Sequence, residues 1–429
     1  MKKLTPLKTI LFLLLPFLSA QADVIPMTVD GMIEKSAAIL SGKVVAKASR
    51  MDPKRRILLT DFTLRIDEDF TGKQSGELTC TVLGGQLAGI EQRASFLNDF
   101  SVGEDMILML RENARNSRSP FVGGWQGMIR KGEFSSGAKG KSASGWMQKS
   151  EEGKEVILDY EAFKSALRLR VAASKGSGRN KASRKSQLYR FGSGSAQPYT
   201  TFGSVATIPI TFLVTPSSDT KVAGRDADMM EAWNKYAPLF DPQTLSAAWA
   251  IGNGKFEIAG FVNDDVMLET FELTWDDTGA VAFALSQSDS NQNILEADIF
   301  MNPYLNWTFD STLPSRNPTY YLIDTVMTHE LGHTLGLDHE FGVLAIMNYA
   351  QNQYEGDSSI HSNDAYNLRY LYPEHALAMT DLGVYLYNDA SSQPFDYANS
   401  TLSSSVISPG TSFQVQNYSL ENTGTSDVA

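Results

Sequence analysis

The chain contains very little cysteine. Cys80 is the only one among 429 residues, so an intramolecular disulfide is excluded. It lies in the run Leu78–Val82, where apolar and polar residues alternate as they do in a half-buried strand. We therefore expect a buried core thiol.

Long apolar runs are scarce as well. The first residues hold one, Ile10–Leu18, which follows a basic start with Lys2, Lys3 and Lys8 and precedes the small-x-small site Ala20–Ala22. This pattern is typical of a secretory signal peptide over residues 1–22. The run is too short to span a bilayer as a permanent helix, and no later stretch qualifies. We expect a secreted or periplasmic protein without a permanent membrane anchor.

Positive charge is in deficit. The formal net charge is −12, which argues against a nucleic-acid partner. Hydrophobic residues make up 42% of the chain, enough for substantial cores. The length predicts two or three domains.

The pattern from about residue 30 to 130 is that of a small all-β domain. Thr60–Asp67 alternates strictly between apolar and polar residues, as a half-buried strand does. We expect a barrel-like sheet within an N-terminal domain of residues 23–172. Further strands are expected at Ile39–Val45, Leu78–Leu83 and Met106–Leu110, separated by turns at Gly84–Gly85, Gly103 and Gly123–Gly124.

A helix and a linker follow this domain. Asp159 is a good N-cap for the helix. Residues 173–200 are rich in serine, glycine and basic residues, which predicts a flexible linker. It is either a solvated tether or a site where a protease separates the two parts. One face of the helix should be apolar, with Tyr160, Phe163, Leu167 and Val171.

Strand and helix patterns mix in residues 201–375, which predicts an α/β or α+β domain. Residues 376–429 are β-like again, and we expect a partial β-sandwich-like tail that resembles an incomplete immunoglobulin-like module. The expected strands are Ile208–Val214, Leu295–Met301, Leu382–Leu386 and Phe413–Val415. The expected helices are Asp226–Tyr236, about Thr319–Gly336, and Ser362–Tyr372 with Ser362 as N-cap.

Histidine is rare, yet three of the five histidines fall within eleven residues. His329 and His333 are four residues apart, so on a helix they point the same way and can bind one Zn²⁺. Glu330 beside them can hold a water. Gly336 can adopt a positive φ, which lets the chain turn and bring His339 back as a third ligand.

Such a site has a defined chemistry. Zinc with three neutral imidazoles and an open position polarises a carbonyl group and activates a water, whose proton Glu330 would take as general base. The alternatives are an amphipathic helix with surface histidines, and a zinc site without activity. His361 and His375 lie outside the cluster, and we expect ordinary surface residues there.

The sequence HELGHTLGLDH at residues 329–339 fits HExxHxxGxxH and so resembles the metzincin zinc peptidases. Met347 in Ala345–Tyr349 resembles the methionine turn of that family. Within the family, Gly336–His339 is similar to the matrixins, here of a bacterial, secreted type. Tyr349 departs from the matrixins and is similar to astacins and serralysins, which implies a transition-state stabiliser at this position.

The resemblance implies a catalytic domain with a twisted mixed sheet and a zinc helix. It also implies structural Ca²⁺ beside Zn²⁺. The candidate calcium carboxylates, Asp264–Asp265 and Asp276–Asp277, are equally typical of solvated surface groups. The cysteine-switch motif of the matrixins is absent around Cys80, so a thiol cap on the zinc would be of another kind.

The leading hypothesis is a secreted zinc endopeptidase that acts on proteins or peptides. One alternative is a secreted adhesion or binding protein whose metallopeptidase domain is secondary or inactive. Another is a surface protein that cuts its own basic linker. The sequence leaves the cleavage preference and the oligomeric state open.

Overall fold

The computed structural model describes most residues between 25 and 373 and two short strands beyond them. The predicted signal peptide and Tyr349 lie outside the described residues. Within the described residues, no helix is long and apolar enough to cross a membrane. The described residues are 25, 27–97, 100–131, 145–150, 155–176, 186–191, 201–215, 225–242, 244–245, 248–311, 313, 319–339, 345–347, 360–373, 382–386 and 418–422.

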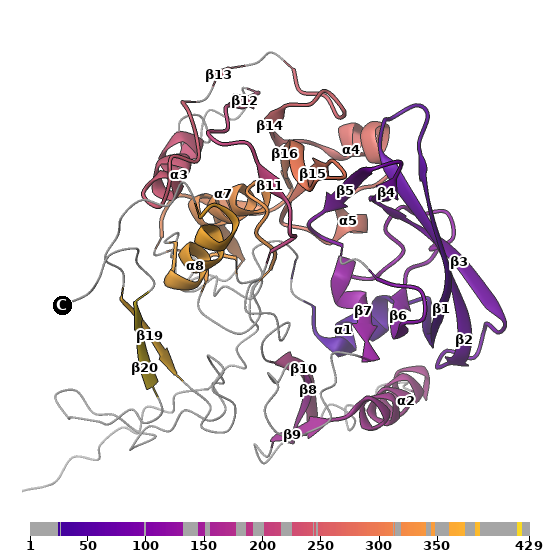
Figure 1. Ribbon diagram of the computed structural model, residues 1–429. Helices are drawn as coiled ribbons and strands as arrows, with labels where there is room; N and C mark the ends of the chain where they lie inside the picture. The colour runs from indigo at the N-terminus through magenta and orange to yellow at the C-terminus, as the bar shows by residue number, and fades with distance from the viewer. Residues whose placement is uncertain are drawn as a thin grey trace, which may run out of the picture.

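A five-stranded antiparallel sheet dominates the N-terminal half (Figure 1). In spatial order its strands are β3 (Glu77–Leu83), β2 (Leu58–Asp69), β1 (Ala38–Met51), β6 (Asp105–Leu110) and β7 (Met128–Arg130). The alternating run Thr60–Asp67 lies inside β2, and the three other strands expected in this half lie inside β1, β3 and β6. Closure of the sheet into a barrel stays a prediction.

Cys80 lies in β3 opposite Phe62 of β2, and its side chain is buried in the core of this sheet. Burial raises the pKa of the thiol to about 12, so the thiol stays neutral. The expectation of a core thiol is confirmed. Among the described residues, Cys80 does not belong to the group that could hold a metal ion.

Two helices, α1 (Val29–Lys35) and α2 (Tyr160–Gly176), share a core with this sheet. The carboxylate of Asp159 accepts a hydrogen bond from the Ala162 backbone N–H at 2.7 Å, which confirms the predicted N-cap. The predicted apolar face is also confirmed, because its four residues, Tyr160, Phe163, Leu167 and Val171, are all buried.

The predicted linker, residues 173–200, contains regular structure. Helix α2 continues to Gly176, and Ser186–Phe191 forms strand β10. This strand pairs with β8 (Gly145–Ser150), which pairs with β9 (Glu155–Leu158). The domain boundaries and the processing of this segment stay predictions.

The second half is built on a mixed sheet of eight strands. Its parallel strands and the antiparallel β15 confirm the expected mixed α/β architecture. Two of the eight strands, β4 (Gly85–Leu87) and β5 (Ile90–Ala94), come from the N-terminal half and extend the sheet beyond β15 (Figure 1). The other strands are β11 (Val205–Ala206), β12 (Phe212–Val214), β13 (Thr244–Leu245), β14 (Phe256–Phe261), β15 (Ala282–Ser288) and β16 (Asn293–Met301).

Each face of this sheet has its own core. One face packs against α3 (Arg225–Asn234), α7 (Ile323–Thr334) and α8 (Ser362–Leu371). The other packs against α4 (Asp264–Phe271) and α5 (Trp275–Thr278). This second core also contains N-terminal residues, Ile57, Leu59, Leu83, Phe96 and Trp125, so the two halves of the chain share one hydrophobic core.

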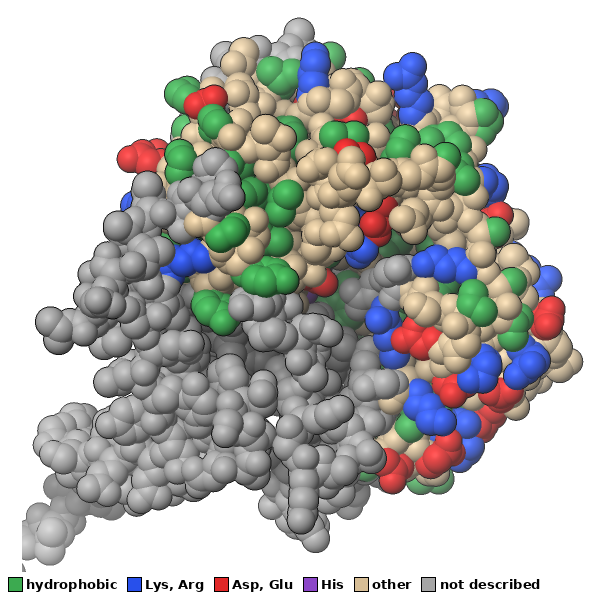
Figure 2. Space-filling model, in the orientation of Figure 1, with side chains coloured by type: hydrophobic (Ala, Val, Ile, Leu, Met, Phe, Trp, Pro, Cys, Tyr) green, Lys and Arg blue, Asp and Glu red, His purple; other side chains and the backbone are tan. Residues whose placement is uncertain are grey.

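The surface differs between the two halves. Figure 2 shows acidic and basic side chains crowded together over the N-terminal sheet, and fewer of them over the rest of the visible face. Several are paired across that sheet, including Lys43 with Asp105 at 2.7 Å and Arg50 with Asp61 at 3.0 Å.

Short pairs complete the described structure. Strand β17 (Asn306–Thr308) pairs with β18 (Tyr320–Leu322) just before α7. In the tail, β19 (Leu382–Leu386) pairs with β20 (Tyr418–Asn422), so the strand expected at Leu382–Leu386 is confirmed. The strand expected at Phe413–Val415 lies outside the described residues, and the sandwich-like tail stays a prediction.

Candidate metal centre

Helix α7 carries the histidine cluster and is shorter than the sequence predicts. Its expected start at Thr319 was wrong, because residues 320–322 pair as β18 and the helix begins at Ile323. It ends at Thr334, two residues before Gly336, whose φ is +90°. A side chain at Gly336 would also collide with the Ser204 carbonyl, so both the turn and the close approach require glycine.

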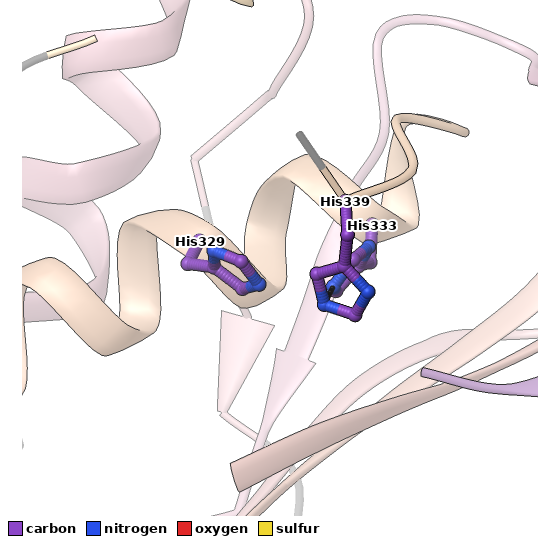
Figure 3. Close-up of side chains that lie close together, drawn as sticks. All are labelled: His329, His333 and His339. Atoms are coloured by element: carbon purple, nitrogen blue, oxygen red, sulfur yellow. Dashed lines mark hydrogen bonds between the residues drawn. The ribbon is translucent and has the colours of Figure 1, made fainter. Parts of the chain in front are cut away.

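The three predicted ligands converge (Figure 3). One ring nitrogen from each of His329, His333 and His339 lies within 4.8 Å of the others. The ring centroids are 4.7 Å apart for His329 and His333, and 4.5 Å apart for His333 and His339. All three side chains are buried. Within the described residues, no other group of three or more His, Cys, Asp or Glu side chains comes this close.

Backbone carbonyls orient two of these rings. His329 Nδ1 lies 2.7 Å from the Ile346 carbonyl oxygen, and His333 Nδ1 lies 2.9 Å from that of Leu337. Each Nδ1 therefore carries the proton, which leaves Nε2 as the ligating atom. His329 Nε2 is buried without a hydrogen-bond partner among the described residues, as expected of a nitrogen prepared for a metal.

The electrostatics favour neutral imidazoles. Burial, and to a smaller extent the neighbouring His339, lower the pKa of His329 to about 3. Burial also holds the pKa of His333 well below its usual value. A neutral ring is the form that binds zinc, so the residues present fit this metal.

Glu330 lies in helix α7, and Met347 packs against the same helix. Glu330 follows His329 in the same turn of α7 and is fully buried. Met347 packs directly against the helix at Gly332. A side chain at position 332 would collide with the Met347 sulfur. The absence of a side chain at position 332 thus lets the methionine approach the helix closely.

Asp364 holds the methionine turn in place, a role that the sequence analysis missed. Its carboxylate accepts hydrogen bonds from the backbone N–H groups of Ile346 at 2.7 Å, Met347 at 3.1 Å and His361 at 2.9 Å. The prediction of Ser362 as the N-cap of α8 was wrong, since His361 holds that position. The sequence did contain a signal for this role, because an acidic residue at the third position of a helix is typical of a capping box.

The comparisons with known proteins agree with this geometry. Residues 260–373 match the family model of the matrixins. We refer to residues 260–373 as the matrixin domain, after the family model that they match. It runs from the end of β14 to Pro373, two residues after α8, and includes the whole histidine cluster. A search of curated proteins found no match to the chain.

Phe202 also contacts the centre of the matrixin domain and was missed from the sequence. Its ring stacks on His333 with centroids 5.7 Å apart. Its backbone N–H donates to the Gly336 carbonyl at 2.8 Å. Asp338 accepts a hydrogen bond from the His339 backbone N–H, as a structural carboxylate would.

Two of the calcium candidates in the matrixin domain have structural partners. Asp264 accepts a hydrogen bond from the Trp275 backbone N–H at 2.8 Å. Asp277 closes a capping box on α5 and forms an ion pair with Arg111 at 2.9 Å. These contacts account for both carboxylates without a cation.

Proposed function

We propose that this protein is a secreted, zinc-dependent endopeptidase. The matrixin domain indicates a metallopeptidase, and hence a hydrolase that acts on proteins or peptides. The convergence of three buried imidazoles is the observation that carries the proposal. The signal-like first residues support secretion.

His329, His333 and His339 would hold the zinc. The bound metal would polarise the scissile carbonyl and activate a water. Glu330 would accept a proton from that water and pass it to the leaving amine, because its carboxylate lies beside the ligands and away from bulk solvent. Met347 would support the ligands from below. Tyr349 as a transition-state stabiliser and structural Ca²⁺ belong to the same proposal on family grounds alone.

The test compares wild type with Glu330→Ala on an unfolded protein substrate, with zinc content measured for both. We expect both proteins to hold zinc and only wild type to cleave. The loss should reach at least about a hundredfold, the usual size of a general-base contribution. Equal cleavage by the two proteins, or wild type without zinc, would overturn the proposal. Zinc binding without any cleavage would favour the adhesion or binding alternative.

The N-terminus of the protein collected from the medium tests the secretion. Mass spectrometry should give a mature chain that begins near residue 23. An intact residue 1 on exported protein would contradict the signal peptide. A second cut within residues 173–200 that disappears in Glu330→Ala would show self-processing of the linker.

A further inference from the structure

The hairpin β4–β5 covers the edge of the peptidase sheet. Within the matrixin domain, β15 is the outermost strand, and β5 pairs antiparallel with its C-terminal part, Leu285–Ser288. Figure 1 shows the two N-terminal strands beside β15. The paired residues are Leu285 with Ala94, Ser286 with Arg93, Gln287 with Gln92, and Ser288 with Glu91.

The N-terminal sheet holds this hairpin in place. The Gln92 side chain accepts a hydrogen bond from the Leu58 backbone N–H at 2.7 Å and is buried. Just after β5, Ser95 Oγ accepts from the Ala284 backbone N–H at 3.1 Å, and the Ser95 N–H donates to the Ala284 carbonyl at 3.0 Å. The hairpin therefore bridges two sheets.

A chain of contacts connects the covered edge with the metal centre. Helix α7 packs on β15 and β16, and the Arg93 guanidinium lies over the Phe202 ring, 5.4 Å from its centroid. Phe202 in turn stacks on His333. A cavity of about 120 Å³ is lined by β4–β5 together with Phe202 and Asp338. One residue of β5 is thus separated from a metal ligand by a single aromatic ring.

An uncovered β15 would offer a row of unpaired N–H and C=O groups at the edge of the sheet on which α7 packs. Such an edge binds extended peptides by adding them as a further strand. A peptidase needs this kind of placement, because the scissile bond must be held against the reacting groups. Strand β5 fills that place with the protein's own backbone.

We propose that β5 occupies the edge on which an extended peptide substrate pairs, so that the chain folded in this way is a latent peptidase. This inference rests on the proposed function. The activated form is the one in which β4–β5 has left β15, and substrate and hairpin compete for the same backbone groups.

A reversible cross-link tests the competition in the full-length chain. Glu91→Cys with Ser288→Cys ties β5 to β15, because directly opposed residues of antiparallel strands lie within disulfide reach. The control pair, Thr63→Cys with Thr79→Cys, ties β2 to β3 in the same way, away from β15. Both pairs are built in a Cys80→Ala background.

The unlocked hairpin opens part of the time, and the cross-link removes that population. We expect the oxidised Glu91/Ser288 pair to cleave an extended fluorogenic peptide at least about tenfold more slowly than its reduced form. The control pair should cleave at the same rate in both states. Equal rates for the oxidised and reduced Glu91/Ser288 pair, with zinc bound, would overturn the inference and leave the peptidase function intact.

A second variant needs no cross-link. Arg93→Ala removes the contact with Phe202 and should raise cleavage severalfold above wild type, because the hairpin is held less tightly. Arg50→Ala, which removes an exposed ion pair of the N-terminal sheet, is the matched control and should leave the rate unchanged. A rate for Arg93→Ala at or below wild type counts against latency. If no variant cleaves and none holds zinc, the proposed function itself fails.

Discussion

The two faces of the eight-stranded sheet are built in opposite ways. On one face, a single run of eleven residues, 329–339, supplies the three histidines and the glutamate of the metal centre. On the other face, side chains from residues 57–125 interlock with side chains from residues 249–300. The first face is organised by local spacing, and the second by contacts between distant parts of the chain.

The metal-binding groups are therefore specified by local sequence, whereas the surrounding fold depends on contacts between distant residues. The spacing of the histidines already specifies which atoms can meet. The second face shows that the N-terminal half is part of the fold that carries the histidine cluster, because it completes a core and covers a sheet edge. The strongest test of this view is whether damage on the second face destabilises the first.

Trp125→Ala should give the largest effect on stability. Trp125 belongs to the N-terminal half and is 1% exposed in the shared core. Truncation leaves a large cavity and should cost about 3–5 kcal/mol. Thermal unfolding should show one transition, shifted for the whole chain. Leu169→Ala, at a residue 74% exposed on α2, should change little. Two transitions, with the upper one unshifted, would mean that the halves unfold independently.

Asp364→Ala should give the second-largest effect. This residue lies on the face of the sheet that carries the metal centre. Three backbone N–H groups lose their acceptor, and a buried unsatisfied donor costs about 1–3 kcal/mol. Zinc affinity should fall as the turn at Met347 loosens. Asp364→Asn keeps one carbonyl oxygen and should lie between alanine and wild type. Unchanged zinc affinity in Asp364→Ala, measured by competition with a chelator, would remove this residue from the account.

Gly336→Ala combines two costs, and a matched control separates them. A positive φ disfavours alanine by about 1–2 kcal/mol, and the new methyl group also meets the Ser204 carbonyl. Gly254→Ala has a similar φ, +72°, but no atom within 4 Å of the added carbon. Denaturant unfolding should show a larger loss for Gly336→Ala than for Gly254→Ala. Equal losses would mean that the contact with Ser204 carries no energy.

Asp298→Asn should give the smallest change, visible in its pH dependence. Burial, and then the charges of Glu296 and Glu257, raise the pKa of Asp298 well above 3.8. The folded state therefore holds its proton more tightly than the unfolded state does, and stability is lost as the pH rises from about 4 through the raised pKa. Melting temperatures of Asp298→Asn should fall less over that range than those of wild type. Parallel curves would contradict the raised pKa.

Much of the metal centre could be predicted from the sequence, because its residues are close together in the chain. His329, His333 and His339 needed only a helix and one turn. Phe202 could not be predicted, since it reaches His333 from 131 residues upstream. The capping-box spacing indicated Asp364 as a helix cap, but its contact with the methionine turn could not be predicted, because Ile346 and Met347 are distant from it in the sequence.

The same distinction between local and long-range contacts applies to the fold. Alternation located β2, since buried residues alternate with more exposed ones along the middle of this strand. It could not reveal that β5 leaves that sheet and pairs with β15, because pairing partners leave no local periodicity. The start of α7 was misplaced for a related reason, since pairing with β17 draws Tyr320–Leu322 into a strand.

Zinc stoichiometry tests the central claim most directly, namely that one short segment forms a zinc site. Metal analysis after exhaustive dialysis should find about one zinc per chain in wild type and in His375→Ala, which alters a histidine outside the cluster. His333→Ala should retain none under the same conditions. A full equivalent of zinc in His333→Ala would contradict the account.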